Sequence, residues 1–138
     1  MFSIGQLSTR TGVKVPTIRY YEEIGLLPAP ERTGGNQRRY GVEGLQRLGF
    51  VKHARDLGFS IEAITKLLEL QDHPDCTCAE AGDLAQAQLL AVQSKIARLN
   101  RLQAELQRLV AGCHGDGTTG ECYVMASLAD HDLCLDEH

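Results

Sequence analysis

Apolar residues recur every three or four positions along most of this chain, which is the spacing of an amphipathic helix. The first helix is expected to begin at Ile4, with Ser3 as its N-cap, and the second at about Val15, with Pro16 in its first turn. A glycine-containing break at residues 11–13 separates them. Two short helices joined in this way predict a helix-turn-helix, whose second helix can enter the major groove of DNA.

The stretch from residue 28 to residue 40 breaks the helical pattern. Its prolines and its Gly34-Gly35-Asn36 turn predict a small β-hairpin, or wing, and its arginines and tyrosine suit contact with phosphate. Helical spacing then resumes over residues 42–54 and 61–70, until Asp72-His73-Pro74-Asp75 interrupts it.

A single long helix is expected from about Ala79 to Ala111, a stretch without proline. About 30 residues at 1.5 Å per residue give a rod of about 45 Å. One narrow apolar stripe on so long a rod favours a coiled coil with a second copy of the chain, the alternative being packing against its own N-terminal half. The stripe consists of Leu89, Val92, Ile96, Leu99, Leu102, Leu106 and Leu109.

Charge is distributed unevenly along the 138 residues. The net charge is −4, but residues 1–55 carry nine Lys/Arg against four acids, a net +5 that leaves −9 for the rest. An acidic total argues against nucleic-acid binding, whereas a segregated basic half argues for it. We find no glycine-rich phosphate loop, nucleophile elbow or poised carboxylate pair, so an enzyme is not expected.

The location that the composition favours is the cytoplasm, without membrane insertion. No uncharged apolar run approaches the roughly 20 residues that cross a bilayer, and the N-terminus lacks the pattern of a secretory signal. In that reducing compartment, five cysteines indicate metal ligands or redox groups rather than disulfides.

Four of the cysteines flank the long helix. Cys113 and Cys122 are joined by a loop with three glycines, which lets the chain curl so that two sulfurs meet one atom, and Cys76 and Cys78 precede the helix. Thiolates favour soft or borderline ions such as Hg²⁺, Cd²⁺, Pb²⁺ and Zn²⁺ over Mg²⁺ or Ca²⁺.

These motifs together resemble the MerR family of bacterial transcription regulators. The resemblance covers residues 1–71 almost continuously, and the long helix and the cysteine positions extend it over residues 72–128. It is carried by Ile4-Gly5-Gln6-Leu7, Thr17-Ile18-Arg19-Tyr20-Tyr21-Glu22, Gly25-Leu26-Leu27, Arg38-Arg39-Tyr40 and Leu57-Gly58-Phe59-Ser60 followed by Ile64.

The resemblance implies a mainly α fold: a winged helix-turn-helix DNA-binding head, a long antiparallel coiled-coil dimerisation helix and a C-terminal metal-binding loop. The corresponding segments are the head (1–71), the linker and dimerisation helix (72–111), the metal-binding loop and short helix (112–128) and a flexible tail (129–138).

The implied activity is transcriptional control by a homodimer on double-stranded promoter DNA. Such regulators bind an overlong promoter spacer with or without inducer, and metal makes them distort the DNA so that RNA polymerase can use it. The DNA-binding residues implied or suggested by charge are Lys14, Thr17, Arg19, Tyr20, Arg32, Arg38, Arg39 and Tyr40, with Ile18 and Tyr21 as alternative core residues.

The implied metal site joins two subunits: Cys113 and Cys122 of one chain with the partner subunit's Cys78. This set is similar to that of the mercury sensors and nearly that of the lead and cadmium sensors, whereas copper and silver sensors carry Ser in place of Cys78. A divalent soft ion is therefore expected, Hg²⁺, Pb²⁺ or Cd²⁺ ahead of Zn²⁺. Candidate additional ligands are His114, Cys76 and Cys134, with Asp116 or Glu121 as further options for a fourth zinc ligand.

The main alternative is a transcription regulator that senses oxidants through Cys113 and Cys122. It would respond to peroxide without metal and would not depend on Cys78 of the partner subunit. The cysteines after the long helix are too sparse for the iron–sulfur branch of the family.

Overall fold

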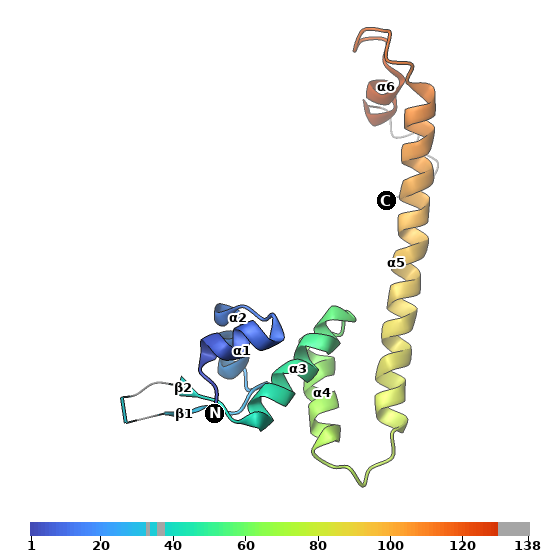
Figure 1. Ribbon diagram of the computed structural model, residues 1–138. Helices are drawn as coiled ribbons and strands as arrows, with labels where there is room; N and C mark the ends of the chain where they lie inside the picture. The colour runs from blue at the N-terminus through green and yellow to red at the C-terminus, as the bar shows by residue number, and fades with distance from the viewer. Residues whose placement is uncertain (33, 36–37, 130–138) are drawn as a thin grey trace. The chain divides into compact units, whose positions relative to one another are not determined.

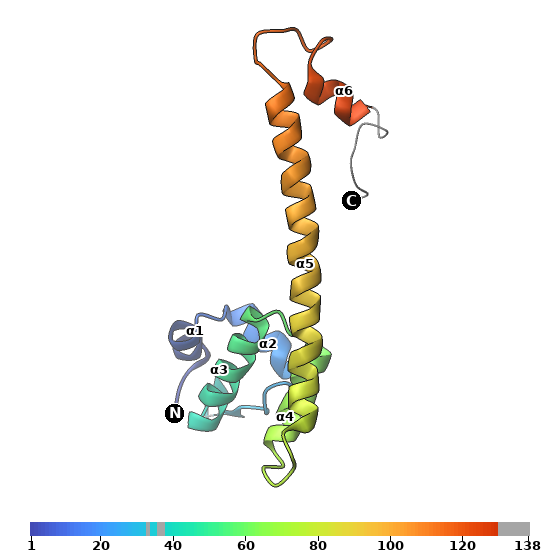
Figure 2. The same ribbon diagram turned by 90° about the vertical axis from the view of Figure 1, so that its right-hand side faces the viewer.

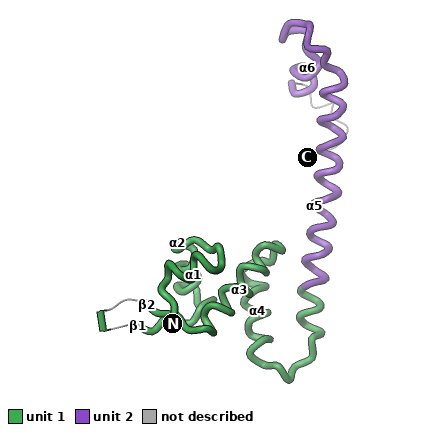
Figure 3. Tube along the Cα trace, in the orientation of Figure 1, with its two compact units in different colours: residues 1–84 green, residues 85–138 purple. Residues whose placement is uncertain are grey.

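The computed structural model describes residues 1–32, 34–35 and 38–129 and divides the chain into two compact units. The first unit is Met1–Leu84 and the second is Ala85–His138 (Figure 3). The elements of the first unit are α1 (Ile4–Thr11), α2 (Val15–Glu23), β1 (Glu31–Arg32), β2 (Arg38–Arg39), α3 (Val42–Asp56) and α4 (Ile61–Gln71). The long helix α5 (Ala79–Gly112) begins in the first unit and ends in the second, where α6 (Tyr123–Ala129) follows.

Local sequence signals determine where α1 and α2 begin and end. The Ser3 hydroxyl accepts a hydrogen bond from the Gln6 amide (3.1 Å), and the Gln6 side chain accepts one from the Ser3 amide (2.8 Å), which is a complete capping box. Gly12 then ends α1 in the left-handed region (φ 77°), which glycine adopts without steric cost. With Pro16 in the first turn of α2, the predicted helix-turn-helix is confirmed.

The predicted wing is a two-stranded antiparallel hairpin. Glu31 pairs with Arg39 and Arg32 with Arg38. At its base, Phe2 and Tyr40 exchange backbone hydrogen bonds of 2.7 and 2.8 Å, which attach the N-terminus to the end of β2. Figure 1 shows the hairpin projecting from the α1–α3 side of the first unit.

The core of the first unit lies between these helices and α3 and α4. Twelve buried side chains form one cluster in which Leu7, Ile18, Leu48, Val51 and Ile64 have no exposed surface. Its other members are Val13, Tyr21, Leu26, Leu27, Tyr40, Ala54 and Leu68. The head therefore has its own hydrophobic core, which is what lets a small unit present a helix face at a fixed angle.

The second unit contains most of α5 and the shorter α6. Both views show α6 beside the C-terminal end of α5 (Figures 1 and 2), where Leu109, Glu105 and Ser127 are buried. The remaining stripe of α5 is open in the single chain, with Leu89, Ile96, Leu99 and Leu106 between 48% and 63% exposed. This exposure agrees with a stripe reserved for a second chain, although the antiparallel pairing itself stays a prediction.

Helix lengths differ from the sequence expectation only at their ends. Three helices end one or two residues after the expected last residue: α3 at Asp56, α4 at Gln71 and α5 at Gly112. The predicted segment boundaries stay predictions, since α5 runs unbroken across the division between the two compact units. Within the described residues, none of the helices combines the length and apolarity that a membrane span requires.

Candidate functional site

The outward face of α2 is the candidate DNA-reading surface. Lys14 occupies the N-cap and is exposed, as are Arg19 and Tyr20, while Thr17 is half-buried. The opposite face carries Ile18 and Tyr21 into the core, at 0% and 7% exposure. This division confirms the alternative that Ile18 and Tyr21 are packing residues. A helix buried on one side can present the polar residues of its other side to a DNA groove without rearranging.

The wing contributes further cations beside α2. Arg32 in β1 is exposed and Arg39 in β2 is half-buried. Arg38 pairs with Arg32 through the backbone, while its side chain lies outside the part of the chain that the structure describes. Arg32 and Arg39 therefore both lie on this short projecting hairpin, and their roles as DNA contacts stay predictions.

Tyr40 takes a different position from the one expected of a phosphate contact. Its side chain is buried, and its hydroxyl donates a hydrogen bond to Glu22 at the end of α2. Buried phenols keep a hydrogen-bond partner of this kind because an unpaired hydroxyl is costly in the interior. The geometry therefore favours a supporting role for Tyr40, joining the base of the wing to α2.

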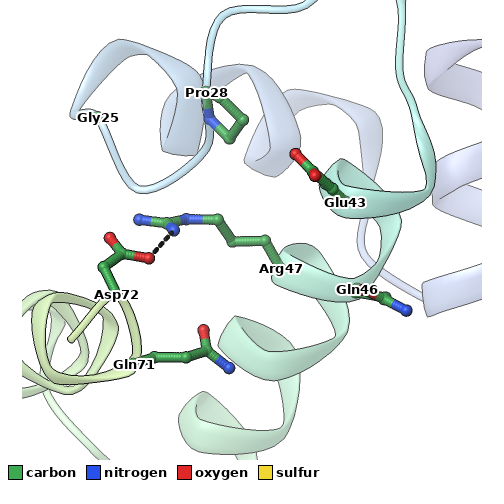
Figure 4. A pocket seen from close by; sticks show the side chains of 7 residues that line it. All are labelled: Gly25, Pro28, Glu43, Gln46, Arg47, Gln71 and Asp72. Atoms are coloured by element: carbon green, nitrogen blue, oxygen red, sulfur yellow. Dashed lines mark ion pairs between the residues drawn. The ribbon is translucent and has the colours of Figure 1, made fainter. Parts of the chain in front are cut away.

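A second set of contacts joins α3 to the segments on either side of it. Arg47 donates through Nε to the Leu26 carbonyl (3.0 Å). Arg47 also forms an ion pair with Asp72 (3.6 Å), which Figure 4 shows. Arg47 and Asp72 line a polar pocket of about 550 Å³. The lining residues are Gly25, Pro28, Glu43, Gln46, Arg47, Gln71 and Asp72, a set without the sulfur or imidazole ligands that soft metals prefer.

The two thiols of the glycine-rich loop meet at the end of α5. Cys113 Sγ and Cys122 Sγ are 4.0 Å apart, beside a hollow of about 290 Å³ that the loop itself encloses. Gly115 adopts a left-handed conformation (φ 76°) that allows the chain to reverse, and short-range bonds from the Glu121 and Cys122 amides close the turn. The loop thus brings together two of the three predicted ligands.

The surroundings of Cys122 lower the pKa of its thiol. The backbone N–H groups of Met125 and then Val124, at the start of α6, lower its pKa, and the Cys113 side chain adds to this effect. Partial burial opposes it and raises the pKa. A thiol that ionises more easily binds metal with less competition from protons.

Cys78 lies in the segment before α5 and is exposed, as is Cys76. Residues 79–112 separate Cys78 from the loop, and a helix of that length extends about 50 Å. Within the described residues of one chain, no three Cys, His, Asp or Glu side chains gather where a metal could bind. His114 is exposed in the loop, while Cys134 lies outside the described residues.

The distance between the two sulfurs limits the coordination geometry. With a zinc–sulfur bond of about 2.3 Å, two thiolates are about 3.8 Å apart in a tetrahedral site and about 4.0 Å apart in a trigonal one, and the longer bonds of larger ions increase each separation. A linear pair would need about 4.6 Å. The observed 4.0 Å therefore fits a bent pair, whose ion has room for at least one more ligand.

A polar cluster beside the loop has no counterpart in the sequence predictions. Arg108 donates one hydrogen bond to the buried Glu105 and another to the hydroxyl of Tyr123, the residue after Cys122. The Glu105 hydrogen bond raises the pKa of Arg108, so the guanidinium stays charged. The three-residue spacing of Glu105 and Arg108 was the available signal, but many exposed helical pairs share it.

A winged helix-turn-helix head combined with a long helix and a terminal thiol loop defines a DNA-binding regulator with a sensor segment. A family model described as MerR HTH family regulatory protein matches residues 2–71, and one described as MerR, DNA binding, matches residues 45–109. The chain belongs to the MerR family of helix-turn-helix regulatory proteins, which are DNA-binding transcription regulators and not enzymes. The predicted family and its mainly helical fold are thereby confirmed.

Relatives and solved structures match nearly the whole chain. A mercuric resistance operon regulatory protein of Pseudomonas fluorescens is 42% identical over 126 residues, 91% of this chain and 86% of that protein. The transcriptional regulator ZntR of Escherichia coli K12 is 42% identical over 130 residues, 93% of this chain and 92% of its own. The crystal structure of PbrR691 from Ralstonia metallidurans CH34 in complex with lead(II) is 38% identical, with a TM-score of 0.78 over 93% of this chain and 99% of that one.

Proposed function

We propose that this protein is a metal-responsive transcription regulator that binds promoter DNA as a homodimer and activates transcription when a divalent soft metal binds. The observation that carries the proposal is the 4.0 Å separation of the Cys113 and Cys122 sulfurs. Relatives named for mercuric resistance, the regulator ZntR and the lead complex of PbrR691 support a metal as the inducer.

The third ligand in this proposal is the partner subunit's Cys78. A bent pair of thiolates leaves coordination positions open, and one chain supplies no third group among its described residues. The open apolar stripe of α5 gives a second copy a surface to bury, and antiparallel pairing would bring the start of one α5 to the end of the other. His114 and Cys76 remain candidate additional ligands beside these three.

The ion expected here is Hg²⁺, Pb²⁺ or Cd²⁺, with Zn²⁺ as the fourth candidate. A site of three thiolates suits a soft ion, whereas zinc ordinarily takes four ligands. Metal binding would shift the two DNA-binding heads of the dimer. The heads would then distort the promoter so that RNA polymerase can use it. Lys14, Thr17, Arg19, Tyr20, Arg32, Arg38 and Arg39 are the proposed DNA contacts, with Tyr40 as their support.

Mixing two inactive variants tests the shared site. Chains with Cys78→Ser are refolded together with an equal amount of chains with Cys113→Ser and Cys122→Ser, and Cd²⁺ is titrated while thiolate–cadmium absorption is recorded. Each variant alone lacks a complete site, whereas each mixed dimer has one. The mixture should recover about a quarter of the wild-type sites, because half of randomly paired dimers are mixed.

Two controls accompany this titration. Promoter binding should be unchanged in every variant, because the substituted cysteines lie outside the core of the head. A mixture that binds no more Cd²⁺ than its separate components would overturn the shared site. Full binding by the Cys78→Ser chain alone would overturn the role of Cys78.

A thiol switch is the second candidate function, and the close sulfurs and the lowered pKa of Cys122 are the observations that favour it. Peroxide would take two electrons from the Cys113 and Cys122 thiols, which would form a disulfide as the peroxide is reduced to water. Peroxide-induced transcription in metal-free buffer, retained in Cys78→Ser, would identify this mechanism. Induction by metal alone, lost in Cys78→Ser, would identify the metal sensor.

A further inference from the structure

The side chain of Tyr123 is held on two faces at the end of α5. A β-carbon at position 112 would overlap Tyr123 Cδ1, so the ring rests directly against the backbone of Gly112. The Arg108 guanidinium lies over the ring, 5.5 Å from its centroid, and also donates to the Tyr123 hydroxyl. A cation over an aromatic face adds attraction to that hydrogen bond.

Arg108 is itself fixed in position. It donates to Glu105 one turn earlier on α5, and the Glu105 side chain is buried. Arg108 Nε has no hydrogen-bond partner among the described residues, so the guanidinium is oriented by its two bonds through Nη1 and Nη2. A planar guanidinium with two such bonds has little freedom to rotate.

These contacts act on the residues next to the two thiols. Gly112 immediately precedes Cys113, and Tyr123 immediately follows Cys122. The packing of the Tyr123 ring on Gly112 therefore holds the two ends of the loop together, independently of the conformation of the residues between them. The two sulfurs, 4.0 Å apart, belong to the residues directly next to this contact.

We propose that Tyr123, clamped between Gly112 and Arg108, is a positioning residue that determines which ions the thiol pair accepts. By holding the sulfurs about 4.0 Å apart, the clamp favours divalent ions with a bent pair of thiolates and disfavours monovalent ions that need a linear pair of at least about 4.6 Å. This inference rests on the proposed metal site, and it adds selectivity to it.

The test compares Cd²⁺ with Ag⁺, which prefers linear dithiolate coordination. Both affinities are measured by competition titration on the full-length wild type and on Tyr123→Ala. The ratio of Cd²⁺ to Ag⁺ affinity should fall about 10-fold or more in Tyr123→Ala, in line with losses seen when groups that orient metal ligands are removed. Tyr123→Phe, which retains the ring on Gly112, should retain most of the selectivity.

A double substitution separates positioning from simple loss of folding. Gly112→Ala should also lower the ratio, because its new methyl group displaces the ring. In the Tyr123→Ala background the same Gly112→Ala change should have little further effect, since the ring is gone. Arg108→Ala should resemble Tyr123→Ala, while Arg101→Ala, an exposed arginine on the same helix, should match the wild type.

Each result bears on a separate claim. An unchanged Cd²⁺/Ag⁺ ratio in Tyr123→Ala, or equal effects of Gly112→Ala in both backgrounds, would overturn the clamp. Wild-type protein that binds neither ion through Cys113 and Cys122 would instead overturn the proposed metal site. Promoter binding and far-ultraviolet circular dichroism, measured on each variant, identify any chain that fails to fold.

Discussion

Cys122 is a proposed metal ligand whose surroundings change the pKa of its thiol. Amide groups of Met125 and Val124 lower its pKa, so the folded chain holds the thiolate more readily than the unfolded chain does. The resulting contribution to stability is present above the unfolded pKa and is lost as the pH falls through the folded pKa. Metal binding at Cys122 should therefore persist to lower pH than an ordinary thiol would allow.

The pH dependence of alkylation measures this shift. Metal-free protein is treated with iodoacetamide across a pH series, and modification of Cys122 is quantified by peptide mass spectrometry. The midpoint for Cys122 should lie at lower pH in the folded protein than in the same protein in urea. Coincident midpoints would show that the start of α6 leaves the thiol unperturbed.

Individual residues were the least predictable part of the site. Spacing placed Cys113 and Cys122 together correctly, since a short loop with glycines has few ways to separate its ends. Spacing could not assign Tyr40 to the core, because an aromatic residue directly after two arginines is equally typical of a phosphate contact. Tyr123 and Arg108 were missed because their contact joins two helices across the loop.

Among the elements, α5 is the one whose apolar surface is left open. Leu106 is 59% exposed in the single chain and lies on the stripe predicted to face a second copy. Burying a leucine contributes about 1.5–3 kcal/mol, and a buried carboxylate is strongly unfavourable. Leu106→Glu should therefore convert the proposed dimer to a monomer at micromolar concentration.

Sedimentation equilibrium at micromolar protein measures this change. Gln93→Glu is the matched control, because residue 93 is exposed and lies about 220° around the helix from Leu106. That variant should sediment as the wild type does. A dimeric Leu106→Glu chain would place the interface on another surface.

The second element with a testable role is α2. Arg19 is exposed on the outward face of this helix, whereas the neighbouring Ile18 is buried in the core. Arg19→Ala should weaken promoter binding and reduce the slope of log affinity against log salt by about 1 per subunit if the side chain neutralises a phosphate. Fluorescence anisotropy with promoter DNA at several salt concentrations gives that slope, and Lys66→Ala on α4 is the control. An unchanged slope would count against the contact.

Helices and their caps were the most predictable elements. Ser3 and Pro16 each stand where a helix begins, and Gly12 follows where α1 ends, because these residue types satisfy or tolerate the special backbone of helix ends. Helix ends still shifted by one or two residues at Asp56 and Gln71, since the last turn depends on tertiary packing that periodicity does not record.

At the scale of the whole molecule, charge and chemistry are separated along the chain. The basic residues gather in the first 55 positions, whereas the acidic excess and the paired thiols lie further along. The MerR family membership follows from residues 2–109, which the two family models match together. The identity of the inducing ion does not follow from the fold, because one relative is named for mercuric resistance whereas the similar PbrR691 structure contains lead(II).

The contact between Tyr40 and Glu22 has a consequence for how a promoter would be read. It joins the hairpin to α2, the helix proposed to enter the groove, and the Phe2–Tyr40 bridge attaches the N-terminus at the same place. The hairpin and α2 would then move together as one unit. A signal from the thiols would change the orientation of this unit on the DNA duplex and leave its base preference unaltered.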